Sequence, residues 1–315
     1  MISTRSDLAK PMVARAVHPL DRFLQQRMQE GNISATALVF TFFCDVVTQH
    51  DGEIWLGSII HALAPLSINE RLTRTAAFRL QQDDWLQSYK QGRRSYYQLT
   101  PTGQNYYKRA ANRIYAGKQP DWDGHWTLLF TSMVPEQKRD ALRRGLLWQG
   151  YGRLASSVYA LPRDQRPALD QLLTELGVTD NIVAMQAHAD DAEALRKLVL
   201  SHWKLDELRR RYKAFTGHYK KAFKALNNRR PASAHSMFLL RILLIHEYRK
   251  ILLSDPELPA VMLPADWDGY AARSLTGDIY RLTAKTSTEW VSQALLNADG
   301  FLPHGGDILK TRFTQ

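Results

Sequence analysis

Apolar residues in the first third of the chain recur at helical spacing and are then followed by a hairpin pattern. After Ser34, a favourable helix N-cap, apolar side chains fall at positions 35, 38, 39, 42, 43 and 46. This spacing predicts an amphipathic helix. The same reasoning predicts helices over 20–30, 34–49, 57–63, 69–82 and 100–115, with paired strands over 85–89 and 94–99. After the first short helix, the order is helix, helix, helix, hairpin, helix, which is that of a winged helix-turn-helix.

The middle third of the chain alternates between strand and helix patterns. A small, polar linker at 116–123 comes first. The sequence then predicts strands over 126–131, 154–161 and 181–187 and helices over 136–148 and 165–176. Such alternation in a short segment predicts a small ferredoxin-like α/β domain.

Helical periodicity dominates the last third. Helices are predicted over 190–226, with a break near Gly217, and over 233–253 and 267–296, with a proline-punctuated loop at 255–264. The chain as a whole therefore predicts a multidomain α+β protein with four parts. These are an N-terminal extension (1–33), a winged-helix domain (34–116), a ferredoxin-like α/β domain (117–189) and a helical C-terminal domain (190–315). We expect the extension to be a mobile start or an arm that docks late.

The charge of the protein is strongly basic and unevenly distributed. The 315 residues carry 42 Lys and Arg against 31 Asp and Glu, a net charge of +11 with a pI near 9.7. Residues 1–120 have a net charge of +6, residues 121–190 of −2 and residues 191–315 of +7. Segregated positive charge indicates that separate parts of the protein meet anions such as nucleic acid, a membrane surface or phosphorylated ligands.

Composition excludes several classes of protein. A single cysteine, Cys44, excludes an intrachain disulfide framework. The longest run of apolar residues and threonine, over 35–44, is half the length that a membrane-spanning helix needs. The first residues lack the apolar core of a secretion signal. We therefore expect a soluble, cytoplasmic protein with no membrane partner.

The helix predicted over 69–82 has an apolar face, formed by Leu72, Ala76 and Leu80, and a basic face opposite it. Guanidinium groups match phosphates and guanine edges, and a helix fits the major groove. A hairpin with arginines at its turn suits the DNA backbone or the minor groove beside that helix. The predicted DNA-binding residues are Asn69, Arg71, Arg74, Thr75, Arg79, Lys90, Arg93, Arg94, Ser95 and Tyr96. The alternative is a winged helix that makes only protein contacts.

No motif in the sequence indicates catalysis, a metal or a cofactor. Gly150, Gly152 and Ala155 match a loose dinucleotide pattern, but they follow a helix and lead into a strand, the reverse of what phosphate binding requires. His246-Glu247 begins like a zinc-protease motif that lacks its second histidine. The basic residues within 209–224 allow three interpretations: a second DNA contact, a site for ligand phosphates, or a solvated face.

Several longer motifs carry a resemblance to a known family. They include G-E-I-W-L-G over 52–57, E-R-L-T-R-T-A-A-F-R-L over 70–80 and G-R-R-S-Y-Y-Q-L over 92–99. Others are W-D-G-H-W over 122–126, L-W-Q-G-Y-G over 147–152, L-I-H-E-Y-R-K over 244–250 and D-P-E-L-P over 255–259. Together they resemble PaaX, the family of phenylacetic acid catabolism repressors, over residues 35 to about 290.

The resemblance implies a homodimeric bacterial repressor with a GntR-like winged helix and a helical C-terminal domain. It also implies cytoplasmic, nucleoid-associated action on palindromic, double-stranded operator DNA at phenylacetate degradation genes. Phenylacetyl-CoA, not free phenylacetate, is implied as the effector that releases the repressor. The middle domain is implied to resemble a CRISPR-associated endoribonuclease, whose catalytic aspartate near the end of the first strand is missing from 126–132.

An acyl-CoA needs an apolar pocket beside cationic side chains. Residue type and closeness to the shared motifs suggest the effector-binding residues Trp148, Arg241, His246, Arg249, Trp267, Tyr270 and Arg273. For His246, a structural role in the core is the competing interpretation. Two other functions stay open at this point: a regulator of the same family that responds to another aromatic acyl-CoA, and an enzyme acting on CoA esters or nucleic acid.

Overall fold

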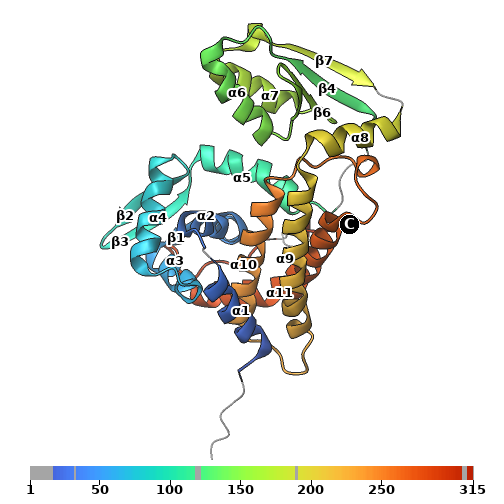
Figure 1. Cartoon of the computed structure of the whole chain (residues 1–315). Helices are drawn as coiled ribbons and strands as arrows, with labels where there is room; N and C mark the ends of the chain where they lie inside the picture. The colour runs from blue at the N-terminus through green and yellow to red at the C-terminus, as the bar shows by residue number, and fades with distance from the viewer. Residues whose placement is uncertain (1–16, 32, 118–121, 189–190, 307–310, 315) are drawn as a thin grey trace, which may run out of the picture.

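The computed structural model describes residues 17–31, 33–117, 122–188, 191–306 and 311–314. Figure 1 shows a large helical body, to which both ends of the chain contribute, and a smaller α/β domain above it. The chain leaves the helical body after α5 and returns to it through α8. The middle of the sequence is therefore the separate part in space.

The N-terminal segment contains helices around a three-stranded antiparallel sheet. Its elements are α1 (Pro19–Glu30), α2 (Ala35–Asp45), β1 (Glu53–Trp55), α3 (Leu56–Leu63), α4 (Glu70–Gln82), β2 (Leu86–Gln91), β3 (Arg94–Leu99) and α5 (Pro101–Ile114). The strand order is β1-β3-β2, so β3 is the central strand. Two N-caps fix the ends of helices: the Asn69 side chain accepts from the Leu72 N–H at 2.9 Å, and Thr100 Oγ1 accepts from the Gly103 N–H at 3.0 Å.

The N-terminal extension includes one docked helix. Helix α1 packs against α9 and α10 through Leu20, Phe23 and Leu24. Arg27 forms an ion pair with Glu247 at 2.8 Å. Within the extension, residues 17–31 therefore belong to the helical body, whereas residues 1–16 lie outside the described residues.

The middle domain has one strand more than the sequence predicts. Its elements are β4 (His125–Phe130), α6 (Glu136–Trp148), β5 (Gly152–Ala155), β6 (Val158–Leu161), α7 (Arg166–Leu176) and β7 (Val183–His188). The segment predicted as one strand over 154–161 is a hairpin that turns at Ser156-Ser157. The resulting antiparallel sheet, in the order β5-β6-β4-β7, carries α6 and α7 and has its own apolar core. This β-α-β-β-α-β arrangement is ferredoxin-like.

The C-terminal segment is helical, but its first break differs from the prediction. Helices α8 (Ala192–His202), α9 (Leu205–Leu226), α10 (Ala234–Leu252) and α11 (Asp268–Ala294) follow one another. The break falls at Trp203-Lys204 and not near Gly217, which lies exposed inside α9. Trp203 leaves the helical path because its indole packs on Gly152 and donates to the Gly150 carbonyl at 3.1 Å. Within the described residues, no helix is long and apolar enough to cross a membrane.

The N-terminal and C-terminal segments share one apolar core. Helix α10 lies at its centre, packs against α2, α5, α9 and α11, and is buried on nearly all sides. Asp45, at the end of α2, lies in the same interior, where its carboxylate is 2.8 Å from both Arg241 Nε and Arg312 Nη1. Burial alone raises the pKa of Asp45, but attraction to the two guanidinium groups outweighs it and lowers the pKa below its usual value. The described residues of segments 19–115 and 205–313 therefore form one body.

Candidate nucleic-acid interface and ligand pocket

The outer face of α4 presents the polar residues that the sequence predicts there. Its inner face buries Thr73, Ala76, Ala77 and Leu80. The five predicted residues on the outer face are all exposed: Asn69, Arg71, Arg74, Thr75 and Arg79. Glu70 accepts hydrogen bonds from Arg74 Nε at 2.9 Å and from Nη2 at 2.7 Å. The carboxylate orients the Arg74 side chain along the helix surface.

The β2–β3 hairpin extends beside α4 and carries the second basic group. Lys90, Arg93 and Arg94 are exposed around the turn, where Gly92 adopts a φ of +61°. The Arg94 guanidinium lies over the Trp55 ring, 4.8 Å from its centroid. Trp55 belongs to β1, whose residues 53–55 pair with 96–98 of β3, so a third strand supports the hairpin.

Two predicted residues of the hairpin are less accessible than expected. Tyr96 is 3% exposed and stacks on Tyr89 with ring centroids 5.4 Å apart. Ser95 is half-buried. Tyr96 is buried because β3 is the central strand, so its side chain packs between neighbours and contributes to the sheet, not to the outer surface.

Phe78 is an exposed apolar residue that was not among the predicted site residues. It lies on the outer face of α4 between Arg74 and Arg79 and is 59% exposed. Burial of an aromatic ring is a major stabilising contribution, so an exposed phenylalanine on a basic face is informative. Phe78 follows Arg71 by seven positions and Arg74 by four, so helical spacing places it on the same side of α4 as these arginines.

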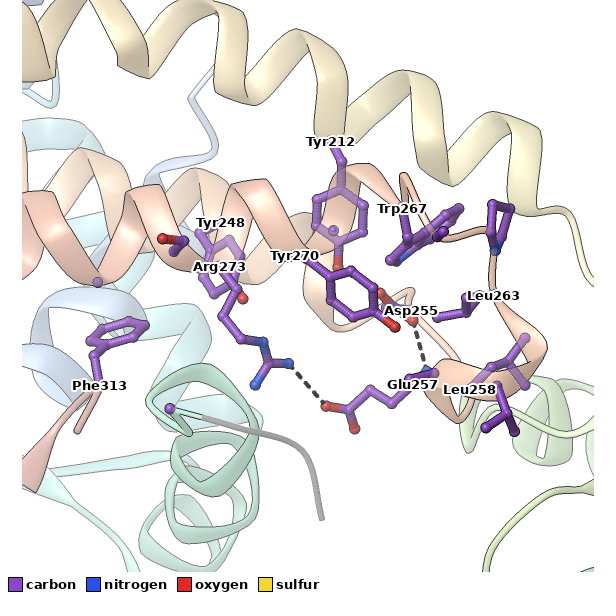
Figure 2. Close-up of a pocket in the computed structure, with 18 of the residues that line it drawn as sticks. Tyr212, Tyr248, Asp255, Glu257, Leu258, Leu263, Trp267, Tyr270, Arg273 and Phe313 are labelled. Atoms are coloured by element: carbon purple, nitrogen blue, oxygen red, sulfur yellow. Dashed lines mark hydrogen bonds and ion pairs between the residues drawn. The ribbon is translucent and has the colours of Figure 1, made fainter. Parts of the chain in front are cut away.

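A cavity of about 710 Å³ opens between α9, α11 and the loop at 255–264. Its walls are largely aromatic: Trp122, Tyr212, Tyr248, Trp267, Tyr270 and Phe313. The size falls within the usual range of about 300–1,000 Å³ for small-molecule sites. Figure 2 shows the Tyr270 ring projecting into the space between Arg273 and Asp255.

The loop at 255–264 contributes two carboxylates to the lining of the pocket. Asp255 accepts a hydrogen bond from Tyr212 Oη at 2.6 Å and from the Glu257 N–H at 2.7 Å. Burial raises the pKa of Asp255 above its usual value, despite these donors. Glu257 adopts a φ of +53° and also lines the cavity. The D-P-E-L-P motif thus supplies both carboxylates of this wall.

The structure brings together three of the seven predicted effector-binding residues. Trp267, Tyr270 and Arg273 line the cavity, whereas Trp148 is 62% exposed on α6 of the middle domain and does not line it. Pocket residues that the prediction missed include Asp255 and Glu257, although the motif that contains them was recognised.

The remaining three predicted effector residues are buried within α10. Arg241 pairs with Asp45, and Arg249 donates to Thr41 Oγ1 at 2.8 Å. His246 Nδ1 lies 3.3 Å from the same Thr41 hydroxyl. Burial, together with smaller effects of the neighbouring Lys250 and Arg249, lowers the pKa of His246 to about 3. These side chains hold the core, which is the competing interpretation of His246, and they do not reach the cavity.

The remaining sequence motifs have structural explanations. Gly150 adopts a φ of +92° in a turn, and a Cβ on Gly152 would lie 2.3 Å from the Trp203 ring. Both glycines thus serve backbone geometry and packing. Across the part of the chain that the structure describes, no group of three or more His, Cys, Asp or Glu residues could hold a metal ion.

The basic residues of α9 separate into paired and exposed side chains. Arg209 pairs with Asp266 and with Asp268, and Arg211 donates to the Lys250 carbonyl at 2.6 Å. The aromatic residues on the same helix face inward, with Tyr212 and Tyr219 buried in the core. These aromatic side chains therefore contribute to the packing of the helical body.

Comparisons with known proteins cover nearly the whole chain. The model of the PaaX-like protein family matches residues 34–103, that of the PaaX protein central Cas2-like domain matches 119–199, and that of the PaaX-like C-terminal domain matches 203–293. The Escherichia coli (strain K12) transcriptional repressor PaaX is 36% identical over 298 residues, which are 93% of this chain and 94% of that protein. The chain belongs to the PaaX family. It is accordingly a regulator of the repressor class and not an enzyme.

The Cas2-like match agrees with the ferredoxin-like middle domain observed here. An uncharacterised protein from Mycobacterium tuberculosis is similar in structure, with a TM-score of 0.48 and 21% identity over 73% of this chain and 88% of that one.

Proposed function

We propose that the protein is a DNA-binding repressor of phenylacetate catabolism genes and that phenylacetyl-CoA releases it from its operator. In this proposal α3, α4 and the β2–β3 hairpin act as a winged helix-turn-helix. The observation that carries it is the exposed basic face of α4 beside a basic hairpin, in a chain of the PaaX repressor family. Helix α4 enters the major groove, and the hairpin contacts the adjacent backbone or minor groove.

The protein acts as a homodimer on a palindromic site. Two copies of α4 would then read half-sites one helical turn apart, about 34–36 Å, or a multiple of that distance. Arginines that contact phosphates displace counterions, so the affinity falls steeply as salt rises.

The effector occupies the cavity beside α11. Its aromatic wall, with Trp267 and Tyr270, suits the phenylacetyl group, and Arg273 offers a cation for the anionic part of the thioester. The ligand shifts the protein toward a state that fits the operator poorly. A change from mostly bound to mostly free requires a differential affinity of about 5 kcal/mol.

Fluorescence anisotropy with a labelled operator tests the DNA-binding half of this proposal. We expect Arg74→Ala to weaken binding by about five- to 150-fold, which corresponds to about 1–3 kcal/mol for a base contact. Arg166→Ala is the matched control, because Arg166 belongs to an exposed i,i+4 ion pair on α7 whose exposure is 56%, against 57% for Arg74. Equal affinity of Arg74→Ala and the wild type would remove α4 from the interface.

The effector half is tested by adding ligands to the same complex. Phenylacetyl-CoA should release the DNA, whereas free phenylacetate and CoA alone should not. Trp267→Ala should raise the thioester concentration needed for release, with operator affinity unchanged. If only a different aromatic acyl-CoA released the DNA, the proposed repressor function would stand, and phenylacetyl-CoA would be wrong as the effector.

A further inference from the structure

Three guanidinium groups from three parts of the molecule surround one carboxylate at the edge of the pocket. Arg113 Nε and Arg163 Nη1 lie 2.7 Å and 3.2 Å from Glu257 Oε2, and Arg273 Nη2 lies 3.8 Å from Oε1. Arg113 belongs to α5, Arg163 to the segment between β6 and α7, and Arg273 to α11. Glu257 itself is 11% exposed in its side chain and lines the cavity. Figure 2 shows Arg273 reaching toward it.

The carboxylate satisfies this cluster only in part. Although Arg113 Nε is close to Glu257, it has no acceptor in hydrogen-bonding geometry among the described residues. The 3.8 Å separation from Arg273 is also too long for a hydrogen bond. Backbone carbonyls accept from some of the remaining donors: Arg113 Nη2 donates to those of Leu252 and Asp255 at 2.9 Å and 2.7 Å, and Arg273 Nη1 to that of Ala116 at 3.2 Å. These acceptors carry no formal charge, so they leave the positive charge of the guanidinium groups in place. A phosphoryl group offers more oxygens and more negative charge to the same donors.

The charge balance points the same way. The carboxylate of Asp255, two positions before Glu257, accepts hydrogen bonds from Tyr212 Oη and from the Glu257 N–H, and even with its charge counted two carboxylates face three guanidinium groups. Burial lowers the pKa of Arg163; Glu257 opposes this effect, and the neighbouring Arg113 adds to it. The cluster therefore retains an excess of positive charge in a partly buried place, where an anion is screened little by solvent.

The backbone of Glu257 is also strained. Its φ of +53° is unusual for a residue with a side chain, and such conformations persist only where the surroundings hold them. The three arginines and the hydrogen bond from the Glu257 N–H to Asp255 keep the residue in this conformation. If another anion took the arginines, the loop at 255–264 would lose the contacts that keep it in place.

We propose that Arg113, Arg163 and Arg273 form a phosphoryl-binding subsite of the pocket, and that Glu257 occupies it as an internal substitute until a ligand phosphate displaces it. This inference rests on the proposed effector site for its location. Displacement of Glu257 also offers a route for release from the operator. Once Glu257 leaves the arginines, the ion pairs that link the loop to α5, to the middle domain and to α11 are lost. Operator affinity then falls because α5 is the last helix of the DNA-binding segment.

Isothermal titration calorimetry with phenylacetyl-CoA, and separately with adenosine 3′,5′-bisphosphate, tests the subsite in the full-length protein. We expect Glu257→Gln to bind both about tenfold more tightly, because an internal competitor is removed. Arg273→Gln should bind both at least about tenfold more weakly, since a charge-assisted hydrogen bond is lost. Glu247→Gln is the matched control, because Glu247 is also a partly buried glutamate paired with an arginine, 19% exposed and 2.8 Å from Arg27, but does not line the cavity; its affinities should stay within about twofold.

The outcomes separate this inference from the proposed function. If phenylacetyl-CoA binds but Glu257→Gln and Arg273→Gln change neither affinity nor its salt dependence, the subsite is wrong and the effector site stands. If the bisphosphate shows the expected changes and phenylacetyl-CoA does not bind, the subsite stands and the effector is wrong. If neither compound binds to a variant or to the wild type, both fail. Thermal unfolding of each variant checks that it folds.

Discussion

The buried carboxylate of Asp45 gives the sharpest test of how the helical body is held together. Asp45→Asn keeps the side-chain volume and removes the charge. Asp45 and Arg241 are fully buried, and Arg312 is 4% exposed, so the variant would leave two guanidinium groups in the interior without a counterion. The carboxylate also accepts from Tyr115 Oη at 2.6 Å. Breaking a buried pair by removing one partner costs about 3–5 kcal/mol.

Urea unfolding followed by far-ultraviolet circular dichroism measures this loss. With an m-value of about 2 kcal/mol/M, a loss of about 4 kcal/mol lowers the midpoint by about 2 M. Asp140→Asn is the control, because that aspartate also pairs with an arginine but is 78% exposed. Its free energy of unfolding should change by no more than about 0.5 kcal/mol. A change of less than about 1 kcal/mol for Asp45→Asn would refute the reasoning.

The difference in the free energy of unfolding between the wild type and Asp45→Asn should also depend on pH, which supplies a second measurement. The folded-state pKa of Asp45 lies below its ordinary value of 3.8, because Arg241 and Arg312 favour the charged form. A lowered carboxyl pKa stabilises the fold above the unfolded-state pKa, and this stabilisation is lost as the pH falls through the folded-state pKa. The difference in the free energy of unfolding between the wild type and Asp45→Asn should therefore be constant from neutral pH to about 5 and become smaller only below about 4.

Three further outcomes follow from single side chains. Phe78→Ala should leave thermal stability unchanged but reduce the preference for thymine over uracil in the operator, measured by anisotropy, because an exposed phenyl ring can contact the thymine methyl group. His246→Leu should flatten the rise of stability with pH between about 3 and 6.5, since the folded-state pKa near 3 makes the unfolded chain bind the extra proton there. Gly152→Ala should lower the free energy of unfolding by about 1–3 kcal/mol, because the added methyl group clashes with Trp203. Gly217→Ala meets open space and should raise the free energy of unfolding by about 0.5–1 kcal/mol. Thermal unfolding measures both, and equal effects of the two substitutions would contradict this packing.

Local pattern predicted most helices and strands because caps and periodicity act within a few residues. The helix predicted over 136–148 has those bounds in the structure. The hairpin at 152–161 escaped prediction because two serines in a short apolar run look like an interruption, yet they form the turn. Gly217 suggested a helix break because glycine costs about 1 kcal/mol inside a helix, but the packing of Phe215 and Tyr219 outweighs that cost.

The candidate site was predictable where it lies on one element and obscure where it depends on several. The arginines of α4 share a helical face, so spacing alone places them together. Tyr96 was expected to contact DNA because the sequence did not reveal that β1 pairs with β3 and makes it the central strand. Arg241 and Arg249 suggested phosphate partners by residue type, but α10 is apolar on nearly every side and carries them into the core.

The participation of Arg312 and Phe313 in the core has a consequence for synthesis of the chain on the ribosome. Domains usually fold in order as they emerge. Here the Phe313 N–H donates to the Tyr115 carbonyl at 2.8 Å, and Arg312 reaches Asp45 across 267 positions of sequence. The first helices must therefore wait for residues 312 and 313, while the middle domain, with its own core, can fold earlier. Competence to bind an operator would then be acquired only after residues 312 and 313 have been synthesised.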